Sequence, residues 1–331
     1  MAVKPRVLLI STGGTITMTG ASGSGIAPTL TGEDLVRAVP ALDAIADIDV
    51  VAYSTKPGAS LTFEDLIDIA GVCDAKLGGD CAGAVIVQGT DTIEETSFAL
   101  DLLVDSSSPV IVTGAMRGPQ APGADGPANL LAAVAVAACP DARDLGTLVV
   151  LNDEVHAARY VRKSDTALPS AFTSPGAGPL GRVAEGIPRI HAHIARTAAV
   201  PRPRDIRNCP VAIVKIILGD DARLLRSIPE LGFAGVVIEA MGAGHVPAML
   251  APVIGELAQR MPVVLATRVA AGPVFTQTYG FEGSEKDLVA RGAIPAGGLA
   301  SVKVAVLLRL LLAQGLAGQE LRAAFTLRSS T

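Results

Sequence analysis

Short apolar runs alternate with longer amphipathic stretches along most of the chain. Five runs in the first half are continuously hydrophobic, which is typical of strands covered on both faces of a parallel sheet. They are RVLLIS (Arg6–Ser11), DVVAYS (Asp49–Ser54), GAVIVQ (Gly83–Gln88), PVIVTG (Pro109–Gly114) and GTLVVLN (Gly146–Asn152). This pattern predicts an α/β fold with a doubly wound parallel sheet.

Helices are expected between these strands. Two of them open with Thr-x-x-acid, at Thr31–Asp34 and Thr62–Asp65, which is a capping-box signature of a helix N-terminus. The stretches TIEETSFALDLLV (92–104) and GPANLLAAVAVAA (126–138) continue the alternation. Each helix would carry the chain from one parallel strand to the next.

The alternation stops near residue 196 and starts again near residue 211. Prolines and basic residues gather between Arg196 and Arg204, a composition typical of a linker. The later predicted elements are strands over 211–218, 234–241 and 261–267 and helices over 248–259 and 299–313. For a chain of 331 residues, two domains are the natural expectation. We predict a larger N-terminal domain (1–195), a linker (196–210) and a smaller C-terminal α/β domain (211–331).

Composition narrows the classes of function. A formal net charge of −5 and an aromatic content of 3% argue against binding to nucleic acid or to an anionic membrane. The four cysteines form no C-x-x-C pair and the four histidines no H-E-x-x-H motif, so we expect neither disulfides nor a metal site. The apolar run after Met1 is too brief for a signal peptide, and the run over 299–313 is too short to span a bilayer. We therefore expect a cytoplasmic protein that handles small molecules.

Ligands of open α/β sheets bind beyond the carboxyl ends of the strands. Four segments occupy that position, and three of them combine Thr with Gly. They are STGGTI after the first strand, GTDT after the third, TGAMR after the fourth and NDEV after the fifth. Glycine allows the backbone to approach a ligand, and a neighbouring hydroxyl can point into the crevice.

Four polar residues in or near these loops form a candidate catalytic group. Thr15, Thr90, Asp91 and Lys163 together supply a nucleophile, an orienting carboxylate and a proton acceptor. Each also has a simpler interpretation: Thr15 as a turn residue, Asp91 as a helix N-cap and Lys163 as a solvated base. Burial would lower the pKa of Lys163 and the carboxylate of Asp91 would raise it, and the sequence does not decide between them.

At these segments the chain closely resembles the bacterial asparaginase and glutaminase-asparaginase family, whose members use threonine nucleophiles. Five blocks occur in family order and with similar spacing. They are STGGTI (Ser11–Ile16), VQGTDTIEETSF (Val87–Phe98), VTGAMR (Val112–Arg117), ADGPANL (Ala124–Leu130) and LNDEVHAARYVRKSDT (Leu151–Thr166).

The resemblance implies hydrolysis of L-asparagine to L-aspartate and ammonia, without a cofactor or a metal. Thr15 would be the nucleophile, and Thr90 would act with Asp91 and Lys163. Thr12 is interpreted as loop framework. The family also implies a homodimer or homotetramer in which the second domain of one subunit closes the site of another. The substrate-binding positions that we infer are Gly14, Gly58, Ala59, Ser60, Gly89, Ala115 and His245.

The chain departs from the family pattern at several recognition positions. The tyrosine that usually assists the first threonine aligns with Gly25, in a loop without aromatic residues. Gly58 stands where a serine commonly binds the substrate α-carboxylate, and His245 where an asparagine is found. The glutamate usually donated by a neighbouring subunit has no secure counterpart near Tyr279, Gly280 and Glu282. The open candidates for the missing base are Ser22, Ser24, a water relayed from Lys163, and Tyr279 of a partner subunit.

Because these departures affect recognition of the substrate, other functions stay open. One is hydrolysis of glutamine or another small amide, and a second is binding of an amino acid without turnover. A third is the amidase part of a tRNA-dependent amidotransferase, which is disfavoured by the acidic net charge and by a first strand that begins close to Met1.

Overall fold

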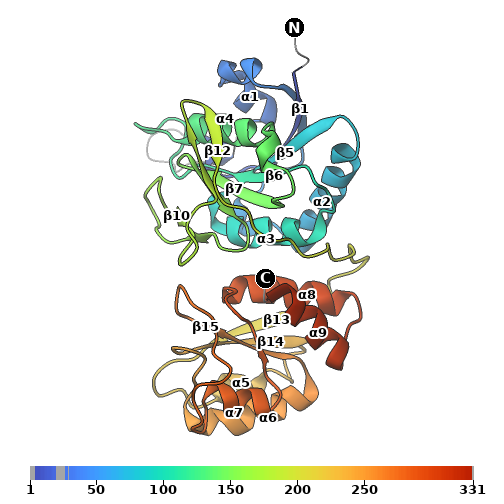
Figure 1. Cartoon of the computed structure of the whole chain (residues 1–331), viewed down its shortest axis with the longest axis vertical. Helices are drawn as coiled ribbons and strands as arrows, with labels where there is room; N and C mark the ends of the chain where they lie inside the picture. Colours follow the sequence, from blue (N-terminus) through green and yellow to red (C-terminus); the bar gives the residue numbers. More distant parts are fainter. Residues whose placement is uncertain (1–3, 20–26, 29, 330–331) are drawn as a thin grey trace. The chain divides into compact units, whose positions relative to one another are not determined.

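The computed structural model describes residues 4–19, 27–28 and 30–329, and the chain divides into two compact units, Met1–Ala199 and Val200–Thr331. Each unit has its own sheet and helices (Figure 1). The predicted α/β class, with a larger N-terminal and a smaller C-terminal domain, is confirmed. The linker at 196–210 and its two boundaries stay predictions.

The sheet of the first unit has eight strands in the order β12-β11-β8-β7-β6-β5-β1-β4. Five are parallel: β4 (Asp47–Ala52), β1 (Arg6–Ser11), β5 (Cys81–Val87), β6 (Val110–Thr113) and β7 (Thr147–Leu151). Three more are added antiparallel: β8 (Glu154–Ala157), β11 (Gly181–Ala184) and β12 (Ile187–Ile190). The sheet is therefore mixed, whereas the hydrophobic pattern predicted only its parallel part.

A tight hairpin explains the change of direction after β7. Asn152 and Asp153 connect β7 to β8, and both have positive φ angles, 51° and 59°. A two-residue turn of this kind reverses the chain and makes the next strand antiparallel. The segment NDEV, which we took for a ligand-facing loop, is mainly this turn and the start of β8.

Two pairs of helices cover the parallel strands (Figure 1). They are α1 (Gly32–Arg37) with α4 (Gly126–Ala137), and α2 (Phe63–Leu77) with α3 (Ile93–Leu103). Both predicted capping boxes are present, at the starts of α1 and α2. On the α1 and α4 face, Leu35 and Leu130 belong to one buried core with Val7 and Leu9 of β1. Short strand pairs complete the unit: β2 (Met18–Thr19) with β3 (Ala27–Pro28), and β9 (Arg162–Lys163) with β10 (Phe172–Thr173).

The second unit is built on a four-stranded parallel sheet in the order β13-β14-β15-β16. Its strands are β13 (Val211–Lys215), β14 (Gly235–Ala240), β15 (Val263–Thr267) and β16 (Ile294–Pro295). Its helices are α5 (Arg223–Ser227), α6 (Ala251–Arg260), α7 (Glu285–Ala290), α8 (Ser301–Ala313) and α9 (Gly318–Ser329). The helices predicted over 248–259 and 299–313 correspond to α6 and α8, whereas α5, α7, α9 and β16 were not predicted.

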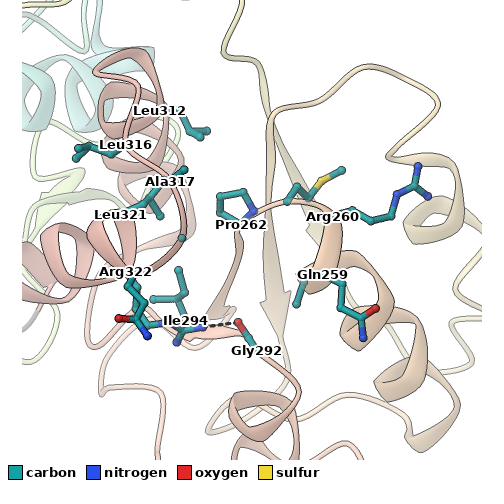
Figure 2. Close-up of a pocket in the computed structure, with 14 residues that line it drawn as sticks. Gln259, Arg260, Pro262, Gly292, Ile294, Leu312, Leu316, Ala317, Leu321 and Arg322 are labelled. Atoms are coloured by element: carbon teal, nitrogen blue, oxygen red, sulfur yellow. Dashed lines mark hydrogen bonds between the residues drawn. The ribbon is translucent and has the colours of Figure 1, made fainter.

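The second unit contains a pocket of about 430 Å³, shown in Figure 2. Pro262, directly before β15, and Gly292, two residues before β16, line it, so the pocket lies at the amino ends of these strands. The guanidinium group of Arg322 donates to the Gly292 carbonyl oxygen at 2.6 Å. None of the predicted catalytic or substrate-binding residues lines this pocket.

Within the described ranges, no helix combines the length and the apolar character needed to cross a membrane. The apolar segment that we considered for this role is α8, with 13 residues. All four cysteines are free thiols; Cys73 and Cys81 are buried, and Cys139 and Cys209 are partly buried.

Candidate active site

The parallel strands bring three candidate loops to one edge of the first unit. Ser11 at the end of β1 pairs with Val87 at the end of β5, and Val87 pairs with Thr113 at the end of β6. The loops that follow therefore start side by side, and they carry Thr15, Thr90 and Ala115. This is the edge at which ligands of doubly wound sheets bind.

Three predicted glycines meet backbone to backbone at this edge. Gly14 has a φ angle of 92°, and a Cβ atom there would fall 2.1 Å from the Gly89 nitrogen. A Cβ atom on Gly58 would fall 2.7 Å from the Gly89 oxygen. Side chains are therefore excluded where the loops touch, and Thr15 and Thr90 directly follow two of the three glycines.

The two threonines of STGGTI have different surroundings. Thr12 is buried, and both its backbone N–H and its hydroxyl donate to the Val87 carbonyl oxygen, at 2.9 and 3.2 Å. This agrees with the prediction that Thr12 is framework. Thr15 is half-buried at the start of a short 3-10 turn, Thr15–Thr17. Its hydroxyl makes no hydrogen bond to any residue that the structure describes, so the group is available to a ligand.

Lys163 connects Thr90 and Asp91. Its Nζ lies 2.9 Å from Thr90 Oγ1 and 2.7 Å from Asp91 Oδ1. The lysine side chain is 20% exposed and that of Asp91 is 67% exposed, so the ion pair lies at the border between protein and solvent. Three of the four predicted catalytic side chains are thus in direct contact, although Lys163 is far from the others in sequence.

Lys163 is held in place by its backbone. It lies on β9, where it pairs with Phe172 of β10, and its N–H donates to Glu94 Oε1 at 2.9 Å. Glu94 lies in the first turn of α3, next to the loop that carries Thr90 and Asp91. We did not predict a role for Glu94, although its position in TIEET, just after GTDT, was a signal that could have indicated it.

A carboxylate and an amide organise the loop that contains Ala115. The N–H groups of Met116 and Arg117 both donate to Asp125, each at 2.9 Å. The Asn129 side chain donates to the Gly114 carbonyl oxygen at 3.0 Å. The sequence reasoning missed both organising residues, although they lie in the block ADGPANL that carried part of the resemblance.

A fourth loop, between β4 and α2, carries three of the positions inferred for substrate binding. Gly58, Ala59 and Ser60 form a 3-10 turn in which Gly58 is buried and the other two are exposed. The Thr92 hydroxyl donates to the Gly58 carbonyl oxygen at 2.9 Å, which ties this loop to the loop of Thr90. The N-cap of α3 is Thr92. The simpler interpretation of Asp91 as that N-cap is therefore wrong.

His245 belongs to the second unit, whereas the other predicted residues belong to the first. It lies edge-on to Tyr279 and Phe281, and its Nε2 is 3.3 Å from Oε2 of the buried Glu285. Burial alone would raise the pKa of Glu285, but the N–H groups of Tyr279 and Thr278 and the nearby imidazole hold it below its usual range. The inferred substrate contact of His245 stays a prediction.

Other candidates concern the missing base and the partner's glutamate. Gly25, Ser22 and Ser24 lie outside the described residues. Tyr279 is 41% exposed, and Glu282 lies 3.6 Å from Arg291. Over the described ranges, no group of three or more His, Cys, Asp or Glu side chains is arranged to hold a metal ion.

Two family models match most of the chain. The model of the asparaginase N-terminal domain matches residues 6–196, and that of the glutaminase/asparaginase C-terminal domain matches residues 210–325. The chain belongs to the asparaginase family. The family resemblance inferred from the five sequence blocks is confirmed.

Individual asparaginases match over nearly the whole chain. An L-asparaginase of Bacillus licheniformis is 33% identical over 93% of this chain and 95% of its own length. A glutaminase-asparaginase of Pseudomonas fluorescens is 34% identical over 81% of this chain and 76% of its own length. The crystal structure of a probable cytoplasmic L-asparaginase from Campylobacter jejuni is 30% identical, covers 97% of this chain and 99% of its own, and has a TM-score of 0.88.

Proposed function

We propose that this member of the asparaginase family hydrolyses the side-chain amide of L-asparagine, with Thr15 as nucleophile. The observation that carries the proposal is the bridge from Lys163 to Thr90 and Asp91, next to the backbone contact of Gly14 with Gly89. A hydroxyl without a hydrogen-bond partner among the described residues, a second hydroxyl bound to an amine, and a carboxylate are groups that can support acyl transfer from an amide.

In the first step, the Thr15 oxygen attacks the carbonyl carbon of the amide. The developing negative charge on the carbonyl oxygen is stabilised by hydrogen-bond donors such as the Thr90 N–H. The proton of Thr15 passes to a base and then to the departing nitrogen, so ammonia leaves and a β-aspartyl ester remains. Water then attacks the ester, which releases L-aspartate and restores the Thr15 hydroxyl.

Lys163 and Asp91 have complementary charges in this scheme. As an ammonium group, Lys163 donates to Thr90 Oγ1 and Asp91 Oδ1, and it must give up a proton before it can act as a base. In this scheme the exposed carboxylate of Asp91 would receive the substrate's α-ammonium group. The base that activates Thr15 stays open among Lys163 acting through water, Ser22, Ser24 and Tyr279 of a partner subunit.

The remaining predicted residues would bind the rest of the substrate. The backbone at Gly14, Gly58, Ala59, Ser60 and Gly89 would surround the α-carboxylate, and the carbonyl oxygen of Ala115 would accept from the amide. His245 would contribute from the second domain of a neighbouring subunit. We propose a homodimer or homotetramer in the cytoplasm that needs no cofactor, metal or nucleic acid.

Ammonia release from L-asparagine, L-glutamine and their D-forms tests the assignment. Thr15→Ala and Thr90→Ala should each lower kcat by about a thousandfold or more, because both remove a group that acts on the reacting carbonyl. Lys163→Met should lower kcat by roughly a hundredfold or more. Thr12→Val keeps the shape of a framework residue and is the matched control, with kcat close to that of the wild type.

Two outcomes contradict the proposal. Full activity of both threonine variants would show that the catalytic group is elsewhere. Calorimetric binding of aspartate without turnover of any amide would instead identify an amino-acid-binding protein on this scaffold. Faster turnover of glutamine than of asparagine would keep the mechanism and change the substrate.

A further inference from the structure

The loop between β4 and α2, residues 54–61, lies against both catalytic loops. The Ser54 hydroxyl donates to the Thr12 carbonyl oxygen at 2.9 Å, and a Cβ atom on Gly13 would fall 2.6 Å from the Lys56 oxygen. Gly58 contacts Gly89 on the other side. The loop therefore adjoins the backbone of both catalytic loops.

The side chain of Asp65 anchors this loop through hydrogen bonds to residues at both of its ends. Lys56 Nζ lies 2.8 Å from Asp65 Oδ1 and 2.7 Å from Oδ2, and the Tyr53 hydroxyl donates to Oδ1 at 3.2 Å. Asp65 Oδ2 also accepts from the N–H of Thr62 at 2.8 Å as part of the capping box of α2. One carboxylate thus ties both ends of the loop to the first turn of a helix.

Because the Asp65 carboxylate is buried, removing the lysine that pairs with it would cost free energy. The Asp65 side chain is 11% exposed, and a buried charge that loses its partner is costly. Burial would raise the pKa of Asp65, but the bonds from Lys56 and Thr62 hold it below its usual range. Burial and the carboxylates of Asp65 and Asp68 raise the pKa of Tyr53, so its hydroxyl keeps its proton and remains a donor.

We propose that Tyr53, Lys56 and Asp65 form a clamp that positions residues 57–60 for the substrate's α-carboxylate. In this scheme Asp65 and Lys56 are positioning residues, because they act through the loop and do not touch the reacting atoms. The inference rests on the proposed function and deepens it. The clamp would compensate for Gly58, which offers no hydroxyl to the carboxylate, by fixing the peptide groups of the turn.

Two variants separate the clamp from the helix cap. Lys56→Met keeps a long side chain but removes the cation, and it leaves the capping box intact. Thr62→Ala removes the capping hydroxyl and leaves the bond between Lys56 and Asp65. Lys56→Met should raise the KM for asparagine about tenfold and change kcat by less than about twofold, since it weakens binding of a group remote from the amide. Thr62→Ala should lower Tm without changing KM.

Two ligands report directly on the α-carboxylate. The inhibition constant of L-aspartate should rise about tenfold in Lys56→Met. That of β-alanine, which is aspartate without its α-carboxylate, should stay within about twofold. An equal rise for both ligands, or a rise of KM in Thr62→Ala as large as in Lys56→Met, would overturn the clamp and indicate a general loss of structure.

Hydrogen exchange tests the clamp independently of catalysis. The N–H groups of Ser60 and Leu61 bond to Pro57 and Gly58 within the turn, and both should exchange faster in Lys56→Met than in the wild type. Unchanged exchange overturns the clamp whatever the enzyme does. If exchange increases but the wild type hydrolyses no amide, the clamp stands as a structural device and the proposed function fails.

Discussion

The two units of the chain differ in how many large apolar side chains they expose to solvent. In the first unit, β1, β6 and β7 are almost completely buried, and among the described residues only Leu168 and Ile187 are large apolar side chains that stay exposed. All the other exposed large apolar side chains belong to the second unit: Ile213, Ile217, Leu218, Leu224, Leu231, Met249, Val269, Phe275, Tyr279, Phe281 and Leu327. Among the described residues, the exposed large apolar side chains are thus concentrated in the second unit.

The two units also differ in what surrounds their candidate site residues. The candidate catalytic loops of the first unit are held by groups of the same unit, such as Asp65, Glu94 and Asp125. The second unit keeps Tyr279 and Phe281 exposed around His245. We infer that the chemistry depends mainly on the internal order of the first unit, and that assembly depends mainly on the second.

The largest expected effect concerns the glycine contact in the first unit. Gly14→Ala forces a Cβ atom into the Gly89 backbone, so we expect a loss of kcat/KM of about a hundredfold or more and a destabilisation of roughly 3 kcal/mol. Gly186→Ala is the matched control, because its φ angle is also positive, 73°, but no atom lies within 4 Å of the added Cβ. It should cost only about 1 kcal/mol and leave kcat/KM unchanged. Enzyme assays measure kcat/KM of the two variants, and urea denaturation measures their free energy of unfolding. Equal losses of activity in Gly14→Ala and Gly186→Ala would refute the importance of the contact.

A smaller effect is expected from the exposed aromatic residues of the second unit. Phe281→Ser should raise the dissociation constant of the subunits about tenfold, since an exposed aromatic ring that becomes covered contributes strongly to association. Leu327→Ser, at an exposed position of α9, is the control and should leave association unchanged. Sedimentation velocity over a range of concentrations would show the difference. A wild-type chain that stays monomeric and fully active would contradict the inference that the second unit serves assembly.

The smallest effect concerns a buried histidine of the first unit. His156 is 1% exposed, its Nδ1 lies 3.0 Å from Ser174 Oγ, and burial lowers its pKa below 6.5 despite the nearby Glu154. The unfolded chain therefore takes up the proton more readily, so this group stabilises the fold above about pH 6.5 and destabilises it as the pH falls. His156→Gln should reduce the slope of unfolding free energy against pH between about 5 and 7. His193→Gln, at an exposed position, is the control and should leave this slope unchanged. Equal slopes in the two variants would show that His156 does not cause the pH dependence.

Much of the fold follows from the hydrophobic pattern because buried parallel strands leave a continuous apolar signal. β1, β5, β6 and β7 each fall within one residue or two of the predicted runs. The pattern did not reveal β11, whose inward and outward residues alternate, or β16, which has only two residues. Both strands are defined by the partners they pair with, and such pairing leaves little local signal.

The candidate site was predictable where chemistry depends on a residue type next to a glycine. Thr15 and Thr90 directly follow a glycine, and Asp91 and Lys163 were selected as charged residues in or near the same loops. Asp65 was visible only as half of a capping box, because its bond to Lys56 depends on how the loop folds back onto the helix. Side chains that support a site across a fold leave no pattern in the sequence.

The contact of Gly14, Gly58 and Gly89 also limits how the enzyme can change. At these buried positions the loops touch through their peptide groups, which a substitution of side chains elsewhere does not alter. Every available substitution there adds atoms to a space that has no room. Evolution or engineering of a new amide preference must therefore act through exposed neighbours such as Ala59 and Ser60, where a new side chain can be accommodated.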